Sequence, residues 1–153
     1  MKKKFFITFI FCLFFYTSLY SIEVGKWSFF IEDSYCYIVS APTKEEGNYS
    51  RRGDVYVLVY RINKSPDQVV QITSGYNYDE KKSVNVLIDK TSFEFFSKED
   101  SAWTKNKDKE VIYAMQKGIK MVITGYSSRG TLTTDTYTLK GFTAALNKLS
   151  KDC

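Results

Sequence analysis

The sequence predicts a mainly β protein: an antiparallel β-sandwich or barrel-like single domain with two short α-helices, one of them C-terminal. Short runs rich in aromatic and β-branched residues recur about every ten residues, with polar turns between them. This spacing is typical of a sandwich or barrel and not of alternating strand–helix units. Helical spacing of apolar residues occurs in only two stretches, which accounts for the two helices.

Six of the expected strands precede the first helix. They cover residues 25–31, 35–39, 55–62, 69–73, 84–88 and 92–96. The turn between residues 62 and 69 contains Asn63, Pro66 and Asp67, which are typical turn residues. Residues 41–53, which include Pro42 and Gly47, are expected to form a loop.

The first helix is expected to start near Asn106 or Asp108, either of which can cap it, and to end at Gly118. A hairpin follows, with strands over residues 119–127 and 131–138. The hairpin then gives way to a terminal helix, for which Thr138 is a candidate cap. Apolar residues at helical spacing in this last segment indicate that the helix packs on the sheet; they are Leu139, Phe142, Leu146 and Leu149.

Arg129 and Gly130 lie in the turn of this hairpin, at Ser128-Arg129-Gly130. The preceding stretch superficially resembles a nucleophile elbow, but its spacing is Gly-x-Ser-x-x-Gly and no base is available to activate the serine. We therefore interpret it as a structural turn. A β-branched residue at Gly130 is expected to be harmful there.

Residues 1–21 are expected to form a cleaved signal peptide. Lys2, Lys3 and Lys4 precede an apolar run that ends at Tyr20, and this run is short for a membrane span of about twenty residues. The alternative is a retained N-terminal anchor. Cleavage would leave a single domain over residues 22–153 with a net charge of +2 and no membrane span, instead of the +5 of the full chain. So small a charge gives little support for nucleic-acid binding.

Cys36 and Cys153 are the two cysteines left after such a cleavage. In an oxidising compartment a widely separated pair is most simply a disulfide, and two free thiols are the alternative. The bond would join the start of the sheet to the terminal helix.

The chain contains no histidine, which excludes serine–histidine and cysteine–histidine catalysis and histidine metal ligands. No nucleotide or calcium motif is present, and we expect no catalytic, cofactor or metal site. A carboxylate pair could still perform acid–base hydrolysis. Asp54, Glu94 and Asp135 are the candidates, although a carboxylate near a strand is usually a solvated edge residue.

Arg52, Gly53 and Asp54 spell the integrin-recognition tripeptide. Their position between a loop and a strand could expose them, so adhesion is a hypothesis for this stretch. The alternative is an ordinary turn before a strand, because a tripeptide match arises easily by chance.

The aromatic residues are compatible with a ligand-binding face. On strands, however, they are more often core residues or cross-strand pairs. We therefore place Trp27 and Trp103 in the core.

Several motifs together resemble the invasion-associated locus B family of exported alphaproteobacterial proteins. The resemblance covers essentially the whole of residues 22–153 and is most specific in the C-terminal part. The matching segments are Trp27, Cys36-Tyr37-Ile38-Val39-Ser40-Ala41-Pro42, Arg51-Arg52-Gly53-Asp54, Ala102-Trp103, Ala114-Met115 with Gly118, Ser128-Arg129-Gly130-Thr131, and the stretch from Thr134 to Ala145.

This resemblance implies a β-rich exported domain, in the periplasm or the outer envelope or secreted, with a link to host-cell invasion in some members. It supplies no catalytic residues. We expect a non-enzymatic module that binds an unidentified protein or envelope component, or supports the envelope. The alternatives are an adhesin using the tripeptide and, third, a carboxylate hydrolase.

Overall fold

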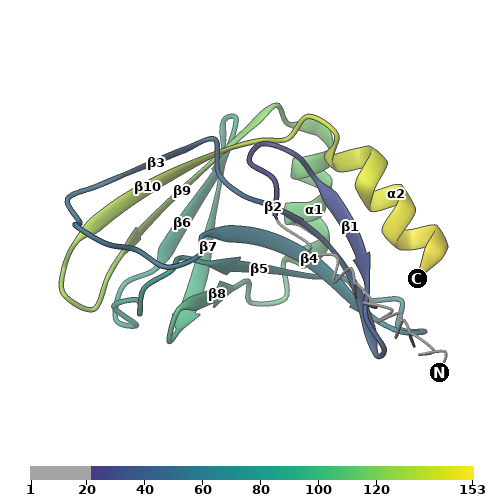
Figure 1. Cartoon of the computed structure of the whole chain (residues 1–153), viewed down its shortest axis with the longest axis horizontal. Coiled ribbons are helices and arrows are strands. Elements are labelled where there is room, and N and C mark those ends of the chain that lie inside the picture. The colour runs from purple at the N-terminus through teal and green to yellow at the C-terminus, as the bar shows by residue number, and fades with distance from the viewer. Residues whose placement is uncertain (1–21) are drawn as a thin grey trace, which may run out of the picture.

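The computed structural model describes residues 22–153, which contain ten strands and two helices (Figure 1). The expected signal peptide lies outside the described residues. The elements are β1 (Ser28–Ile31), β2 (Tyr35–Ser40), β3 (Lys44–Gly47), β4 (Tyr56–Ile62), β5 (Val69–Thr73), β6 (Val84–Ile88), β7 (Thr91–Lys98), β8 (Ser101–Trp103), α1 (Asp108–Lys117), β9 (Lys120–Tyr126), β10 (Leu132–Thr138) and α2 (Phe142–Asp152).

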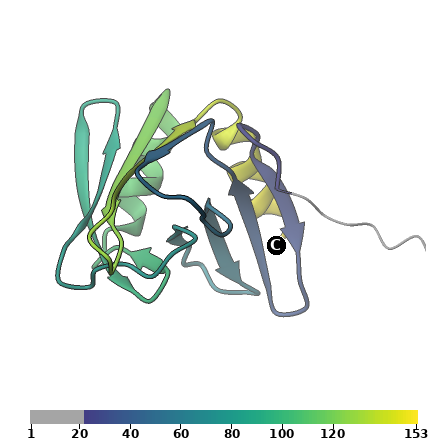
Figure 2. The same ribbon diagram turned by 60° about the vertical axis from the view of Figure 1, so that its left-hand side comes forward.

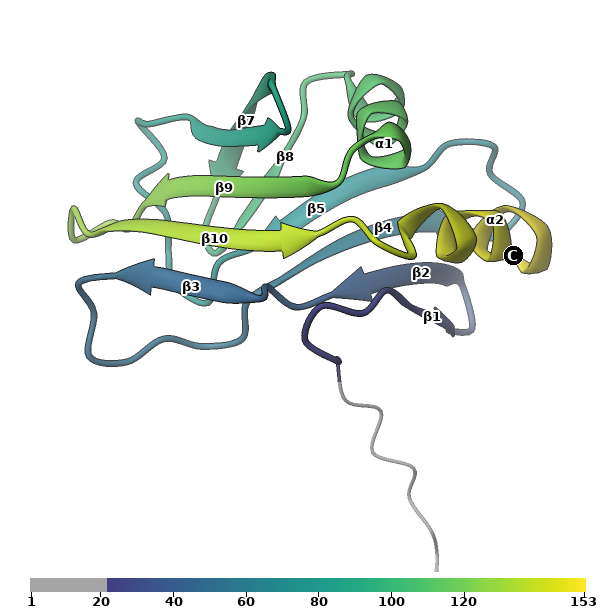
Figure 3. The same cartoon turned by 90° about the horizontal axis from the view of Figure 1, so that it is seen from above.

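The strands form one antiparallel sheet in the order β1-β2-β4-β5-β8-β7-β6-β9-β10-β3. Strand β7 joins its two halves, because its first residues pair with β6 while Phe96–Lys98 pair with β8. The sheet curls into a half-barrel whose edge strands, β1 and β3, are not paired with each other (Figures 2 and 3). The expected mainly β, barrel-like class is therefore confirmed.

Both helices pack on the inner face of this sheet. Helix α1 contacts β5, and α2 contacts β1, β2 and α1. The apolar residues expected at helical spacing do lie in the core: Phe142 and Leu149 are fully buried, and Leu139 and Leu146 are nearly so. Burial of this stripe explains why so short a helix is stable, since a helix of this length alone is marginal in water.

Trp27 is a core residue, as expected. Its ring meets Phe142 of α2 edge-on at a centroid distance of 4.9 Å, and its Nε1 donates a 3.0 Å hydrogen bond to the carbonyl of Thr138. The indole therefore ties the start of the chain to the end of β10.

Trp103, by contrast, is only half-buried, so its expected core position is wrong. It lies in β8 on the outer face of the sheet, where its ring is 6.1 Å from that of Phe96. The alternation of strand residues explains this, because Ala102 takes the inward position.

The loop expected over residues 41–53 contains a strand, β3, which pairs with Thr133–Thr136 of β10. Its four residues are all exposed. An edge strand without a buried face has no alternation of apolar residues, so the sequence pattern could not reveal it.

The expected helix caps are also wrong, although Gly118 does end α1. Lys107 occupies the N-cap of α1 and Gly141 that of α2, and neither makes a side-chain cap. Gly141 has a φ of 86°, which lets the chain turn sharply between β10 and α2.

The predicted disulfide joins Cys36 of β2 to Cys153, with the two Cα atoms 5.9 Å apart. It links the sheet to the end of α2 across 117 residues of sequence. Within residues 22–153, no helix has both the length and the apolar character needed to cross a membrane.

Candidate functional site

A buried ion pair joins the segment after β3 to strand β10. Arg52 donates two hydrogen bonds of 2.6 Å, from Nη1 and Nη2 to the two carboxylate oxygens of Asp135. Its Nε donates a third, also of 2.6 Å, to the carbonyl of Ser74. The two side chains are only 4% and 5% exposed, so the pair is shielded from water.

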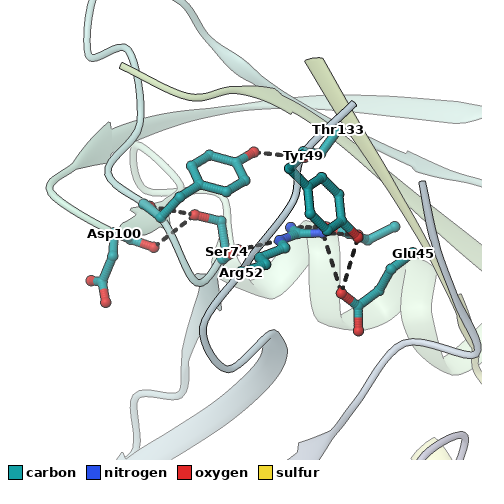
Figure 4. A network of polar contacts seen from close by, with 8 residues as sticks. Glu45, Tyr49, Arg52, Ser74, Asp100 and Thr133 are labelled. Carbon is teal, nitrogen blue, oxygen red and sulfur yellow. Dashed lines mark hydrogen bonds and ion pairs between the residues drawn. The ribbon is translucent and has the colours of Figure 1, made fainter. Parts of the chain in front are cut away.

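Aromatic rings enclose the guanidinium of Arg52. Its Cζ lies 5.4 Å from the ring centre of Tyr49 and 5.1 Å from that of Tyr76, both within cation–π range. Glu45 of β3 approaches Nη1 to 3.5 Å from the solvent side (Figure 4). The hydroxyl of Tyr76 is itself fixed by a 2.6 Å hydrogen bond with Thr133.

Burial and the ion pair act in opposite directions on the pKa of each group in this site. Burial raises the pKa of the Asp135 carboxyl, but the hydrogen bonds and charge of Arg52 oppose this effect. For Arg52, burial opposes the charged form, yet the hydrogen bonds and charge of Asp135 prevail and raise its pKa. Because the fork geometry is bidentate, we take both groups to be ionised at neutral pH.

Two glycines allow the segment bearing Arg52 to reach this position. Gly53 donates a 2.9 Å backbone hydrogen bond to the carbonyl of Gly75, so the two backbones lie in direct contact. A Cβ on Gly75 would come within 2.5 Å of the carbonyl oxygen of Gly53, and Gly75 has a φ of 71°. Both the close approach and the left-handed conformation therefore require glycine.

An open pocket of about 560 Å³ lies over this ion pair. We call it the arginine pocket, because Arg51, Arg52 and Arg129 all line it. None of its twelve lining residues is acidic. The others are Asn48, Tyr49, Ser50, Tyr76, Asn77, Ser127, Ser128, Thr131 and Thr133.

The structure does not bring the three expected carboxylates together. Glu94 aligns through β6 and β9 with Thr134, the neighbour of Asp135, so Glu94 and Asp135 lie on opposite faces of the sheet. Asp54 is exposed in the segment before β4.

Glu45, which the sequence analysis did not single out, is the cross-strand partner of Asp135. Arg52 contacts both carboxylates. If these two carboxylates were catalytic, the substrate would have to bind between them. The guanidinium of Arg52 occupies that position.

The tripeptide of Arg52, Gly53 and Asp54 is not exposed as a unit. The Arg52 side chain is buried in its ion pair, and only Gly53 and Asp54 face solvent. A partner could not contact the guanidinium without first breaking that pair, so the expected exposure is wrong for Arg52.

Arg129 and Gly130 do lie in the turn between β9 and β10. Gly130 has a φ of 85° and donates a 2.8 Å hydrogen bond to the carbonyl of Ser127. The side chain of Arg129 is exposed and contributes to the arginine pocket.

A second surface, which we call the outer face, lies on the side of the sheet away from the helices. Its residues alternate with core residues along the strands. Three of them are well exposed: Tyr35 at 40%, Phe96 at 44% and Ile62 at 60%. The outer face consists of Phe30, Tyr35, Tyr37, Tyr56, Leu58, Tyr60, Ile62, Phe96 and Trp103.

The nine residues of the outer face are apolar or aromatic, and Glu94 and Lys98 of β7 lie on the same side of the sheet, on either side of Phe96. The rings of Phe30 and Tyr35 stack on Tyr37 at 5.3 and 5.8 Å. No side chain that β1, β2, β4, β5 and β8 place on this side is charged. A shallow depression of about 510 Å³ crosses it, lined by Ser34, Tyr35, Tyr56, Leu58, Tyr60, Ile62 and Gln71.

Sequence reasoning missed the Arg52–Asp135 pair because its members are 83 residues apart. One signal was available: Asp135 alternates with Thr133 and Tyr137, which places it on their face of β10. A charge on the face that also carries an aromatic core residue needs a partner, but the pattern could not say which one.

The fold and the disulfide define a small, mostly antiparallel β domain of the kind found in oxidising compartments. The family model for the invasion-associated locus B (IalB) protein matches residues 30–150. The chain therefore belongs to the IalB family. This membership and the disulfide are consistent with an exported protein. Searches of curated proteins and of solved structures returned no match.

Proposed function

We propose that the protein is an exported, non-enzymatic module of the cell envelope that binds another protein through the outer face. The single observation that supports this most is the composition of that face. Stable protein interfaces are enriched in Tyr, Trp and Phe and depleted in charge at their centre. Tyrosine also pairs a large apolar ring with a polar tip, which suits a surface that is exposed before its partner binds.

The geometry of the arginine pocket supports a non-enzymatic role. Asp135 is the most buried of the expected carboxylates, and it is neutralised by Arg52 instead of being positioned opposite a free acid. General acid catalysis needs a carboxyl that is protonated near neutral pH, which a bidentate guanidinium opposes. Turnover of envelope polysaccharide or peptide that is lost in Asp135→Asn but retained in Glu94→Gln would contradict this proposal.

The binding surface can be tested by site-specific photocrosslinking in intact envelopes. A photoreactive amino acid at Ile62 is expected to give a discrete adduct with one protein. The same group at Lys140, which is exposed away from the outer face, should not. Adducts of equal yield at both positions, or adducts with lipid or glycan alone, would contradict a protein partner.

The identified partner must then bind in purified form. Tyr60→Asp places a charge at the centre of the outer face and is expected to weaken binding by about a hundredfold or more. Lys140→Asp, the control, should leave both affinity and folding unchanged. Equal affinity of the wild type and Tyr60→Asp would exclude the outer face.

A further inference from the structure

We propose that the arginine pocket binds an acidic saccharide, that is, a sugar carrying a carboxylate or phosphate group. This site lies apart from the outer face, and its test is independent of the protein partner proposed above.

The pocket presents two arginines whose charge has no ionic partner. Arg52 is paired with Asp135 and also contacts Glu45, which does not line the pocket, whereas Arg51 and Arg129 make no ion pair or hydrogen bond through their guanidinium groups within residues 22–153. Both are exposed, and they come from separate loops. A planar guanidinium donates paired hydrogen bonds to carboxylate and phosphate oxygens, so an anion is the ligand charge that fits.

Neutral polar side chains around the two arginines favour a hydroxyl-rich ligand over a bare ion. In the described part of the chain, none of these four side chains has an intramolecular hydrogen bond: Asn48, Ser50, Asn77 and Ser128. Amides and hydroxyls both donate and accept, which matches sugar hydroxyl groups. The pocket volume of about 560 Å³ lies within the ordinary range for small-molecule sites.

The loops that form the pocket are held in place without a ligand. Ser128 N donates a 2.7 Å hydrogen bond to the carbonyl of Asn77, which fixes the hairpin to the middle segment. Arg52 Nε binds the carbonyl of Ser74, which fixes the segment after β3 to the same place. A site whose walls are already connected loses little conformational entropy when a ligand binds.

The test titrates the purified, oxidised protein with galacturonate, glucose 1-phosphate, glucose and inorganic phosphate, observed by NMR of backbone amides. Both acidic sugars are expected to shift resonances of residues 48–52, 76–77 and 127–131. Glucose should bind at least about tenfold more weakly, because it lacks the charge-assisted hydrogen bonds. The affinities for galacturonate and polygalacturonate are then compared. The tighter ligand shows whether the pocket prefers the acidic sugar as a free monomer or as part of a polymer.

Two double variants that remove the same charge distinguish binding at the arginine pocket from attraction to the overall charge of the protein. Arg51→Gln with Arg129→Gln should lower galacturonate affinity by about tenfold or more at an unchanged melting temperature, since neither guanidinium makes a hydrogen bond or ion pair among the described residues. Lys90→Gln with Lys140→Gln removes the same charge from elsewhere on the surface and should change nothing. Equal losses in both double variants would overturn the proposal. So would inorganic phosphate binding as tightly as the acidic sugars, or an absence of shifts in the three loops.

Discussion

Asp135 carries a charge that the surrounding residues cannot stabilise without Arg52. Asp135→Asn would leave the buried guanidinium without its main partner, and we expect a loss of about 3–5 kcal/mol in the free energy of unfolding. Replacing both residues, as in Arg52→Met with Asp135→Leu, should cost less, because no uncompensated charge remains. Urea denaturation of the wild type, Asp135→Asn and the double variant measures these free energies of unfolding.

Glu46→Gln is the control for this experiment. Glu46 forms an exposed ion pair of 2.8 Å with Lys44 of the same strand, β3, and such pairs contribute about 1 kcal/mol or less. If Asp135→Asn were no more destabilising than Glu46→Gln, Arg52 would not depend on Asp135 in the way described.

Two glycines with similar backbone conformations provide a second comparison at the residue scale. Gly130→Ala places a methyl group in open space, so its cost is the left-handed conformation alone, about 1–2 kcal/mol. Gly75→Ala has the same backbone cost and also drives a Cβ into the carbonyl of Gly53. We therefore expect Gly75→Ala to be clearly the more destabilising in chemical denaturation. Equal losses would show that the two chain segments can separate freely.

Gly130→Val, expected from the sequence to be harmful, adds a β-branched side chain to the same strained conformation. The structure gives the reason as backbone geometry and not as a steric clash, because nothing lies within 4 Å of the added Cβ.

Helix α2 depends on the disulfide as well as on its apolar stripe. In the chain-entropy account, closing a loop across 117 residues stabilises the folded state by about 4–5 kcal/mol. Cys36→Ser with Cys153→Ser should therefore lower the melting temperature strongly, and hydrogen exchange should increase first in α2. Reductant should lower the melting temperature of the wild type but not that of the variant. A wild type unaffected by full reduction would contradict this role.

The molecule as a whole should be sensitive to alkaline pH. Burial raises the pKa of Tyr76, Tyr78 and Tyr137 above their ordinary value of 10.0. The folded protein therefore keeps these protons when the unfolded chain has begun to lose them. Stability is fully present below about pH 10 and falls as the pH rises further. Urea denaturation between pH 8 and 11 measures this dependence.

Tyr137→Phe tests the assignment of this alkaline loss. The Tyr137 hydroxyl is buried and has no hydrogen-bond partner among the described residues, so its removal should not destabilise the protein at neutral pH. The variant should lose less stability above pH 10 than the wild type. If the wild type and Tyr137→Phe lost the same stability above pH 10, groups other than Tyr137 would be responsible for the loss.

Most of the fold could be predicted from local pattern. Alternating apolar residues located the hairpins, helical spacing located α2, and the two cysteines predicted the disulfide. Strand β3 could not be found in this way, because it is held only by backbone pairing with β10 and has no buried side. Trp103 could not be placed either, because an aromatic residue on a strand fits an inner or an outer face equally well.

The sequence by itself determined the fold class, the cross-link and the absence of imidazole chemistry, since these follow from periodicity and composition. Only the tertiary structure decided that Arg52 is buried on Asp135, that Glu45 lies opposite it, and that Arg51 and Arg129 share one pocket. The physical reason is distance along the chain. Contacts between residues about eighty positions apart are set by how the sheet curls, and no local pattern of side chains records that curvature.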